Sequence, residues 1–166
     1  MPDDIILVDK NDQPIGTGQK MEVHKKGQLH RAFSILIFNR FGQLLLQKRV
    51  DSKYHCPGMW TNTCCSHPKP EEDTLSAAHR RLKEELGFDC DLEEKFSFIY
   101  KAEFDNGLTE HEYDHVFFGY YDDPVDFDKN EISDIKWLDI KTIKDQIKNQ
   151  PDIYTDWFKI IISKYF

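Results

Sequence analysis

The chain has 166 residues, of which 39% are hydrophobic and 13% aromatic, and its formal net charge is −8. This composition excludes a disordered acidic chain, and the length predicts a single domain spanning residues 1–166. The negative charge argues against a nucleic-acid partner, because phosphate backbones recruit clustered lysine and arginine. An anionic ligand must therefore meet a local basic pocket.

The N-terminal segment lacks the charged stretch and long apolar run of a signal peptide, and no apolar stretch approaches the length of a membrane span. The four cysteines form a sparse set, and the adjacent Cys64 and Cys65 are poor partners for a disulfide. We expect a cytoplasmic protein with free thiols, no membrane association and no obligate protein partner.

Strands and turns dominate the expected structure of the first half. Ile5–Val8 predicts a strand that ends in a turn-rich stretch, which gives an N-terminal hairpin. Phe33–Phe38 and Leu44–Lys48 are apolar runs, and Asn39–Gly42 between them predicts a second hairpin. The segment that follows, residues 49 to about 70, is long for a structureless loop, which favours a functional role.

A helix is predicted from Thr74 to Leu86, with Asp73 as its N-terminal cap and Gly87 in the left-handed conformation that ends it. At about 100° per residue, Arg81 and Glu85 fall together on one flank as half-buried neighbours. The stripe that faces the core is predicted to contain Leu75, Ala78, Leu82 and Leu86.

The second half predicts an antiparallel pair, a last strand and a closing helix. Phe96–Phe104 alternates apolar and polar residues, and the turn Asp105–Gly107 leads into Glu110–Tyr121. Ile135–Leu138 is the expected last strand, and the helix covers about 155–165. These elements predict an α+β fold with mixed, mostly antiparallel sheets flanked by helices.

Period two along the strand from Glu110 places Glu110, Glu112 and Asp114 on the face that continues as Val116 and Phe118. An inward row of carboxylates costs several kcal/mol unless a metal, cationic partners or open water compensates. A strand end that emerges into solvent is the alternative interpretation.

Three histidines in loop-like places, His24, His30 and His67, add the imidazole ligands that suit Mn²⁺, Fe²⁺ or Zn²⁺ alongside carboxylate. Each alone is more often structural or exposed. A structural zinc site that uses His67 with Cys56, Cys64 and Cys65 is a competing hypothesis, but the spacing does not match paired C-x₂-C ligands.

Four basic residues lie beside the candidate ligand segments. Together they can bind a diphosphate, with arginine offering bidentate contact, and ordinary surface charge is the alternative. They are Lys20, Arg49, Lys53 and Arg81.

The stretch Ser66–Phe88 resembles a modified Nudix box, in which Glu72 is followed seven residues later by Arg-Arg-Leu-Lys-Glu-Glu-Leu-Gly-Phe. Ser66 stands where the box has its leading glycine. Arg81 stands where it has the first glutamate of an Arg-Glu pair. That glutamate supports hydrolytic metal binding in ordinary Nudix hydrolases, so Arg81 argues against hydrolysis.

Type I isopentenyl-diphosphate isomerases have this altered box, and the chain is similar to them in further motifs. Trp60–Pro68 matches their Trp-Thr-Asn segment leading to Cys-x-His-Pro, Glu110–Glu112 their Glu-x-Glu, and Ala32–Ser34 their Ala-Phe-Ser strand. The similarity runs in the family's order from about residue 5 to the C-terminal helix. It implies a Nudix fold and a metal-dependent allylic isomerase that acts on a small diphosphate.

Site residues follow from the resemblance position by position. It implies that Cys65 and Glu112 form the catalytic pair, and that Glu85 is associated with the Mg²⁺ that accompanies the diphosphate. Trp157, with Tyr100 or Trp60, would face a developing carbocation. The ligands implied for a further divalent metal, Mn²⁺ or Zn²⁺, are His24, His30, His67, Glu110 and Glu112, and the substrate-binding cations are Lys20, Arg49, Lys53 and Arg81.

Two rival functions remain open at this level. One is a Nudix hydrolase that cleaves nucleoside or other diphosphates, against which Arg81 and the Cys65-x-His67 element speak. The other is a non-catalytic domain that keeps a metal for stability, which would leave Cys65 and Glu112 without a task.

Overall fold

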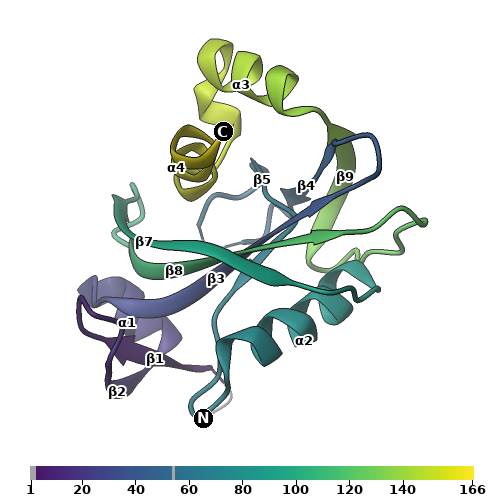
Figure 1. Cartoon of the computed structure of the whole chain (residues 1–166). Coiled ribbons are helices and arrows are strands. Elements are labelled where there is room, and N and C mark those ends of the chain that lie inside the picture. Colours follow the sequence, from purple (N-terminus) through teal and green to yellow (C-terminus); the bar gives the residue numbers. More distant parts are fainter. Residues whose placement is uncertain (1–2, 54) are drawn as a thin grey trace.

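The structure, a computed structural model, describes residues 3–53 and 55–166. A mixed sheet lies between helices, which confirms the predicted α+β class (Figure 1). The elements are β1 (Asp4–Val8), β2 (Pro14–Gln19), α1 (Lys20–Lys26), β3 (His30–Phe38), β4 (Leu44–Arg49), β5 (Trp60–Thr61), β6 (Cys64–Ser66), α2 (Thr74–Leu86), β7 (Glu93–Glu103), β8 (Thr109–Tyr120), β9 (Ile132–Leu138), α3 (Ile140–Asn149), a 3₁₀ turn η1 (Pro151–Ile153) and α4 (Asp156–Tyr165).

Strand β3 is the centre of the sheet. It pairs in parallel with β8 from His30 to Phe38, and over Phe33–Ile35 it pairs with the antiparallel β6. The predicted turn at Asn39–Gly42 is present, but β3 and β4 pair only at Phe38 and Leu44. Because β8 and β6 pair with the two edges of β3, β4 pairs instead with β9 and β5. The two strands of the expected hairpin therefore diverge after the turn.

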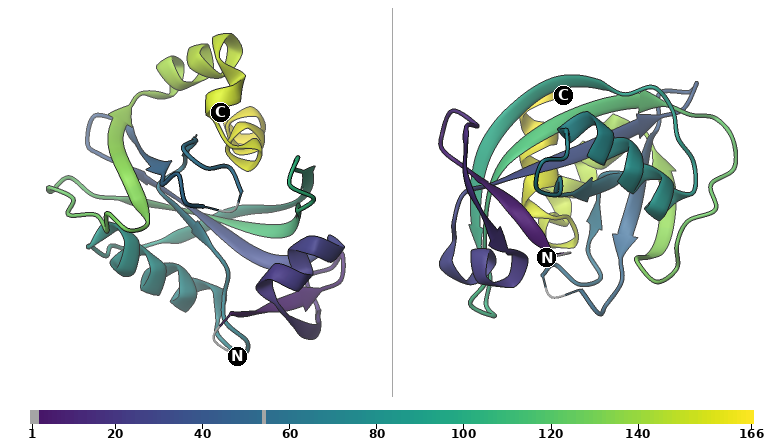
Figure 2. Two further views of the ribbon diagram at one scale, coloured as in Figure 1. Left: turned by 180° about the vertical axis from the view of Figure 1, so that it is seen from behind. Right: turned by 90° about the horizontal axis from the view of Figure 1, so that it is seen from below.

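Alternate residues of β3 supply two separate hydrophobic cores. Phe33 and Ile35 face the core that α2 covers, whereas Leu36 and Phe38 face the core that α4 covers. Figures 1 and 2 show these two helices on opposite faces of the β3–β8–β7 part of the sheet. The strand is therefore buried on both faces, which explains the continuous apolar run Ile35–Phe38.

Helix α2 has the predicted bounds and caps. The Asp73 side chain accepts a hydrogen bond from the Ser76 amide, and Gly87 has a φ of 74°. The predicted stripe was wrong at Leu75, which is 39% exposed, whereas Ala77 is fully buried. Leu75 is the second residue of the helix, and the packed side begins at Ala77 and Ala78.

The hairpin β7–β8 is confirmed, and the face of β8 that begins with carboxylates is buried as predicted. Residues 49–70 contain the short strands β5 and β6. Helix α3 was not predicted, although Ile140, Ile143 and Ile147 give it an apolar side. Of the helices in the described residues, none has the length and apolar character that a membrane crossing requires.

Candidate active site

Three imidazoles and two carboxylates converge near the start of β3. They come from α1, β3, the segment after β6, and β8, and one potential ligand atom from each lies within 4.8 Å of all the others. We name this group the His–Glu cluster. It consists of His24, His30, His67, Glu110 and Glu112.

Backbone carbonyls orient two of the rings. The Nδ1 atom of His24 lies 2.6 Å from the Lys20 carbonyl oxygen, one helical turn earlier, and that of His30 lies 2.9 Å from the Gln28 carbonyl oxygen. Because a carbonyl only accepts, each Nδ1 must carry the proton. The Nε2 atoms then face the carboxylates of Glu110 and Glu112, and they are the atoms through which both rings would bind a metal.

The carboxylates of the cluster differ in charge state. Burial opposes ionisation of Glu112, but its contacts with the Nε2 atoms of His30 and His67, at 3.3 and 2.9 Å, hold the pKa of its carboxyl well below the usual range. Burial and the nearby charge of Glu112 raise the pKa of Glu110 well above that range. The Tyr100 hydroxyl donates to both carboxylates.

The donor set fits a divalent cation. Burial lowers the pKa of His67 to about 3, so its ring is neutral, the form in which imidazole binds metal. Three imidazole nitrogens with two carboxylates suit Mn²⁺ or Zn²⁺. A cation between Glu110 and Glu112 would also allow both groups to ionise, although they are only 2% and 6% exposed.

A cavity of about 400 Å³ lies against the His–Glu cluster. Most residues predicted for the site line it, but His24, His30 and Tyr100 are not among its lining residues and lie behind the wall. Its wall includes Lys20, Arg49, Lys53, Cys65, His67, Arg81, Glu85, Glu110, Glu112 and Trp157.

Neighbouring cysteines on β6 face opposite sides of the sheet. Cys65 pairs with Ser34 and lines the cavity, whereas Cys64 pairs with Ile35 and is fully buried in the core under α2. Burial raises the pKa of the Cys65 thiol to about 12, so the group carries its proton at neutral pH. The alternation also separates the two sulfurs, which leaves the structural zinc hypothesis without a common ligand face.

The predicted basic residues gather on the cavity wall. Burial, and next the charge of Lys53, lower the pKa of Lys20, which shows that these ammonium groups are close enough to repel each other. Arg49 is 7% exposed, donates to the His55 carbonyl oxygen at 3.3 Å and lies over the Trp157 ring at 5.7 Å. This part of the cavity wall is therefore positively charged and suited to bind an anion.

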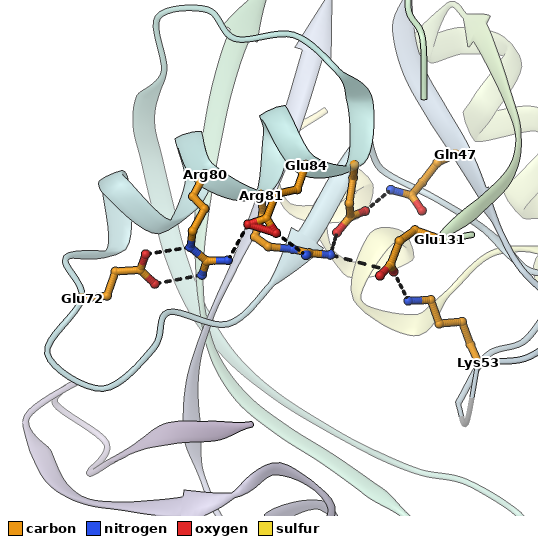
Figure 3. Close-up of polar contacts among 8 residues, drawn as sticks. Gln47, Lys53, Glu72, Arg80, Arg81, Glu84 and Glu131 are labelled. Carbon is orange, nitrogen blue, oxygen red and sulfur yellow. Dashed lines mark hydrogen bonds and ion pairs between the residues drawn. The ribbon is translucent and has the colours of Figure 1, made fainter. Parts of the chain in front are cut away.

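One flank of helix α2 carries a chain of ion pairs (Figure 3). Arg80 bonds both oxygens of Glu72 at 2.8 and 2.9 Å, and Arg81 bonds Glu84 at 2.9 Å and Glu85 at 2.5 Å. Glu85 was predicted to be half-buried, but it is only 5% exposed. We name these five residues the α2 flank.

His55 and Glu131 are among the cavity-wall residues that sequence reasoning missed. His55 lies 6.0 Å from the Trp157 ring, and burial lowers its pKa to about 2. Glu131, just before β9, lies 2.5 Å from Lys53. His55 lies in the long segment 49–70 for which a functional role was expected, whereas no sequence pattern pointed to Glu131. Trp60 is not among the wall residues, and Lys136 lies over its ring at 4.1 Å.

Known proteins resemble the chain along nearly its whole length. Residues 28–158 match the family described as NUDIX domain. Isopentenyl-diphosphate Delta-isomerase 2 of Photorhabdus laumondii is 52% identical over 98% of this chain and 92% of the relative. The Isopentenyl-diphosphate Delta-isomerase of Pectobacterium atrosepticum is 47% identical, over 97% and 90%.

Solved structures agree on the fold. The crystal structure of DR0079 from Deinococcus radiodurans matches with a TM-score of 0.81 at 20% identity, over 98% of this chain and 99% of that chain. The MutT protein of Methanosarcina mazei matches with a TM-score of 0.67 at 18% identity, over 82% and 91%. By its family match and its relatives, the chain belongs to the isopentenyl-diphosphate isomerases of type I, within the Nudix superfamily.

Proposed function

We propose that this enzyme converts isopentenyl diphosphate to dimethylallyl diphosphate, a step of isoprenoid biosynthesis. The observation that carries the proposal is one cavity that combines Cys65 and Glu112 with a basic wall. We further propose that residues 1–166 act as one domain in the cytoplasm, with a small diphosphate as the substrate.

The reaction adds a proton to the terminal alkene carbon and removes another from the allylic carbon, by way of a tertiary carbocation or a state close to it. An unactivated alkene is a very weak base, so an acid and a base must be held against a small hydrocarbon. Cys65 on β6 and Glu112 on β8 approach from two strands that both pair with β3. In our proposal they are that pair, with either donating the proton.

The cationic intermediate needs stabilisation without water. Trp157, 3% exposed, lines the cavity and can present its ring to the developing charge, an interaction worth about 2 kcal/mol when desolvated. Tyr100 lies behind Glu112 and donates to its carboxylate, so it positions that group and does not line the cavity. Excluding water prevents capture of the cation.

The His–Glu cluster would hold one divalent metal, Mn²⁺ or Zn²⁺. When bound, this metal controls the proton affinity and orientation of Glu112. Glu85 would contribute to a Mg²⁺ that accompanies the diphosphate at the other side of the cavity. Gln47 donates to Glu85 at 3.1 Å and to the Thr63 carbonyl oxygen at 2.7 Å, so that carboxylate is fixed in place.

Binding of the diphosphate would use the four cations of the wall. Arg49 and Arg81 can each contact two phosphate oxygens, and Lys20 and Lys53 add point charges. The buried Nε atoms of Arg49 and Arg81 have no hydrogen-bond partner in the described residues, so both guanidiniums keep donor capacity for a ligand.

The test is incubation of the protein with isopentenyl diphosphate and Mg²⁺ in D₂O, followed by proton and phosphorus NMR. Dimethylallyl diphosphate with deuterium at the exchanged positions is the expected product. Release of phosphate would support the rival hydrolase. Metal-dependent thermal stability with neither product would support a non-catalytic metal domain.

A further inference from the structure

Glu131 brings a negative charge to the basic wall where the substrate's diphosphate is proposed to bind. Its carboxylate lies 2.5 Å from the Lys53 ammonium and 3.8 Å from the Arg81 guanidinium, and all three residues line the cavity (Figure 3). A carboxylate at this place repels an incoming anion and competes for both cations. Its position therefore affects how strongly a diphosphate binds.

The fold holds the backbone that carries this carboxylate. The Glu131 and Ile132 amides both donate to the Asp128 carbonyl oxygen, at 3.1 and 2.9 Å, and the Asp128 amide donates to the Glu85 carbonyl oxygen at 2.8 Å. The turn is also packed against the end of α2, where a side chain at Gly87 would collide with the backbone of Asp126. The backbone at Glu131 is thus held near the end of α2.

Lys53 is differently placed. It lies in the loop between β4 and β5, and its ammonium is at the end of four methylene groups, whereas the Glu131 carboxylate is at the end of two. Lys53 can therefore turn from Glu131 to a ligand more easily than Glu131 can move.

The wall needs a counter-ion before substrate arrives. Burial, and next the charge of Lys53, lower the pKa of Lys20, so the cations repel one another. Burial opposes the charge of Glu131, but hydrogen bonding and attraction from Lys53 keep the pKa of its carboxyl below the ordinary value. Glu131 remains ionised and reduces the repulsion between Lys53 and Arg81.

We propose that Glu131 is an internal counter-anion that neutralises Lys53 and Arg81 in the free protein and yields Lys53 to the diphosphate when substrate binds. This rests on the proposed function, because it takes the cavity as a diphosphate site. A carboxylate that must be displaced lowers affinity for the anion, and it stabilises the empty site.

The test compares Glu131→Gln with Glu93→Gln, which makes the same change in net charge on β7, where the Glu93 side chain is 74% exposed. Titration calorimetry with inorganic pyrophosphate at saturating Mg²⁺ measures binding without turnover. We expect Glu131→Gln to bind pyrophosphate roughly fivefold more tightly, with KM for isopentenyl diphosphate falling equally and kcat unchanged. Glu93→Gln should match the unsubstituted protein.

Unchanged or weaker pyrophosphate binding by Glu131→Gln would overturn the proposal, since Glu131 would then be inert or would position Lys53 for the ligand. Two further variants keep the result interpretable. Glu131→Asp withdraws the charge from Lys53 without removing it and should have an intermediate affinity. In a Lys53→Gln background the gain from Glu131→Gln should shrink, and thermal melting confirms folding of each variant. Absence of isomerase activity in the unsubstituted protein would instead refute the proposed function.

Discussion

The His–Glu cluster and the α2 flank are two groups of carboxylates near one cavity, and their charges are balanced in different ways. In the α2 flank, where Glu85 is buried and Glu72 and Glu84 are more exposed, guanidinium groups bond to each carboxylate, as with Arg81 between Glu84 and Glu85. In the His–Glu cluster, the carboxylates face imidazoles, and His67 is neutral because burial lowers its pKa. The cluster therefore has negative charge to offer a cation, whereas the flank is balanced and presents Arg81 to an anion.

The two regions also suit different ligands. A metal needs lone pairs that converge, and the cluster provides them from four elements. A diphosphate with Mg²⁺ needs donors and one carboxylate, and the wall around Arg81 and Glu85 provides both. Cys65 lies on the same wall, where a hydrocarbon held between the two ends would meet it.

The largest expected effect comes from breaking the cluster. His67→Ala should remove the bound metal and lower turnover by roughly 10⁴-fold, because it loses both the metal's electrostatic contribution and a hydrogen bond that orients Glu112. Metal analysis and the isomerase assay measure both effects. His79→Ala, on the outer side of α2, is the matched control and should keep both. Full metal occupancy in His67→Ala would refute the ligand assignment.

Cys65→Ala tests the chemistry between the two regions. It should lower isomerisation roughly 10³-fold and leave metal content and fold intact, because a thiol exchanges a proton and a methyl group does not. Cys64→Ala should keep substantial turnover, since Cys64 packs in the core under α2. Near-normal turnover by Cys65→Ala would end the two-group mechanism, with Glu112, the metal or water then moving the proton.

Arg81→Gln is expected to affect stability more than a surface substitution would. It leaves the Glu85 carboxylate, 5% exposed, with the Gln47 amide and the weak Cys64 thiol as side-chain donors, and should cost about 2 kcal/mol of unfolding free energy after allowance for the partly exposed arginine. Urea unfolding measures the loss. A variant as stable as the parent would mean that Glu85 binds a proton or water instead, and that the α2 flank is not balanced by Arg81.

Arg80→Gln should have the smallest effect, below about 1 kcal/mol, because its partners Glu72 and Glu84 are more exposed. The hydrogen bond from Arg80 lowers the pKa of Glu72 from 4.5, so this stabilisation is present above pH 4.5 and is lost as the pH falls through the lower, folded-state pKa. The difference between parent and variant should shrink in that acidic range. A difference that grows on acidification would contradict the assignment.

Local signals predicted local structure well. The caps of α2 lie next to the residues they cap, so Asp73 and Gly87 fixed its bounds in advance. The sequence could not predict that β3 and β4 diverge, because this depends on β8, which comes about 70 residues later in the chain and pairs along β3. The prediction that Leu75 faces the core was wrong for a related reason, since the angle around a helix does not tell which positions other elements cover.

The site divides in the same way. Period two predicted the carboxylate row of β8 from the residues alone, but its meeting with His24, His30 and His67 came from family resemblance, since these histidines lie far from β8 in the chain. The pair of Lys53 and Glu131 spans 78 residues and had no signal in either segment. Arg81 beside Glu85 was predictable because one helical turn separates them.

We expect the His–Glu cluster to bind a divalent cation by itself. The Arg81 side of the cavity should bind a divalent cation only together with an anion. Equilibrium dialysis of the metal-stripped protein with Mn²⁺, without and with inorganic pyrophosphate, tests both expectations most directly. We expect one tightly bound Mn²⁺ ion without pyrophosphate, and His67→Ala should lose it. A second Mn²⁺ ion should require pyrophosphate, and Glu85→Gln should lose it. No tight ion in the absence of pyrophosphate, or a tight ion that survives His67→Ala, would contradict these expectations.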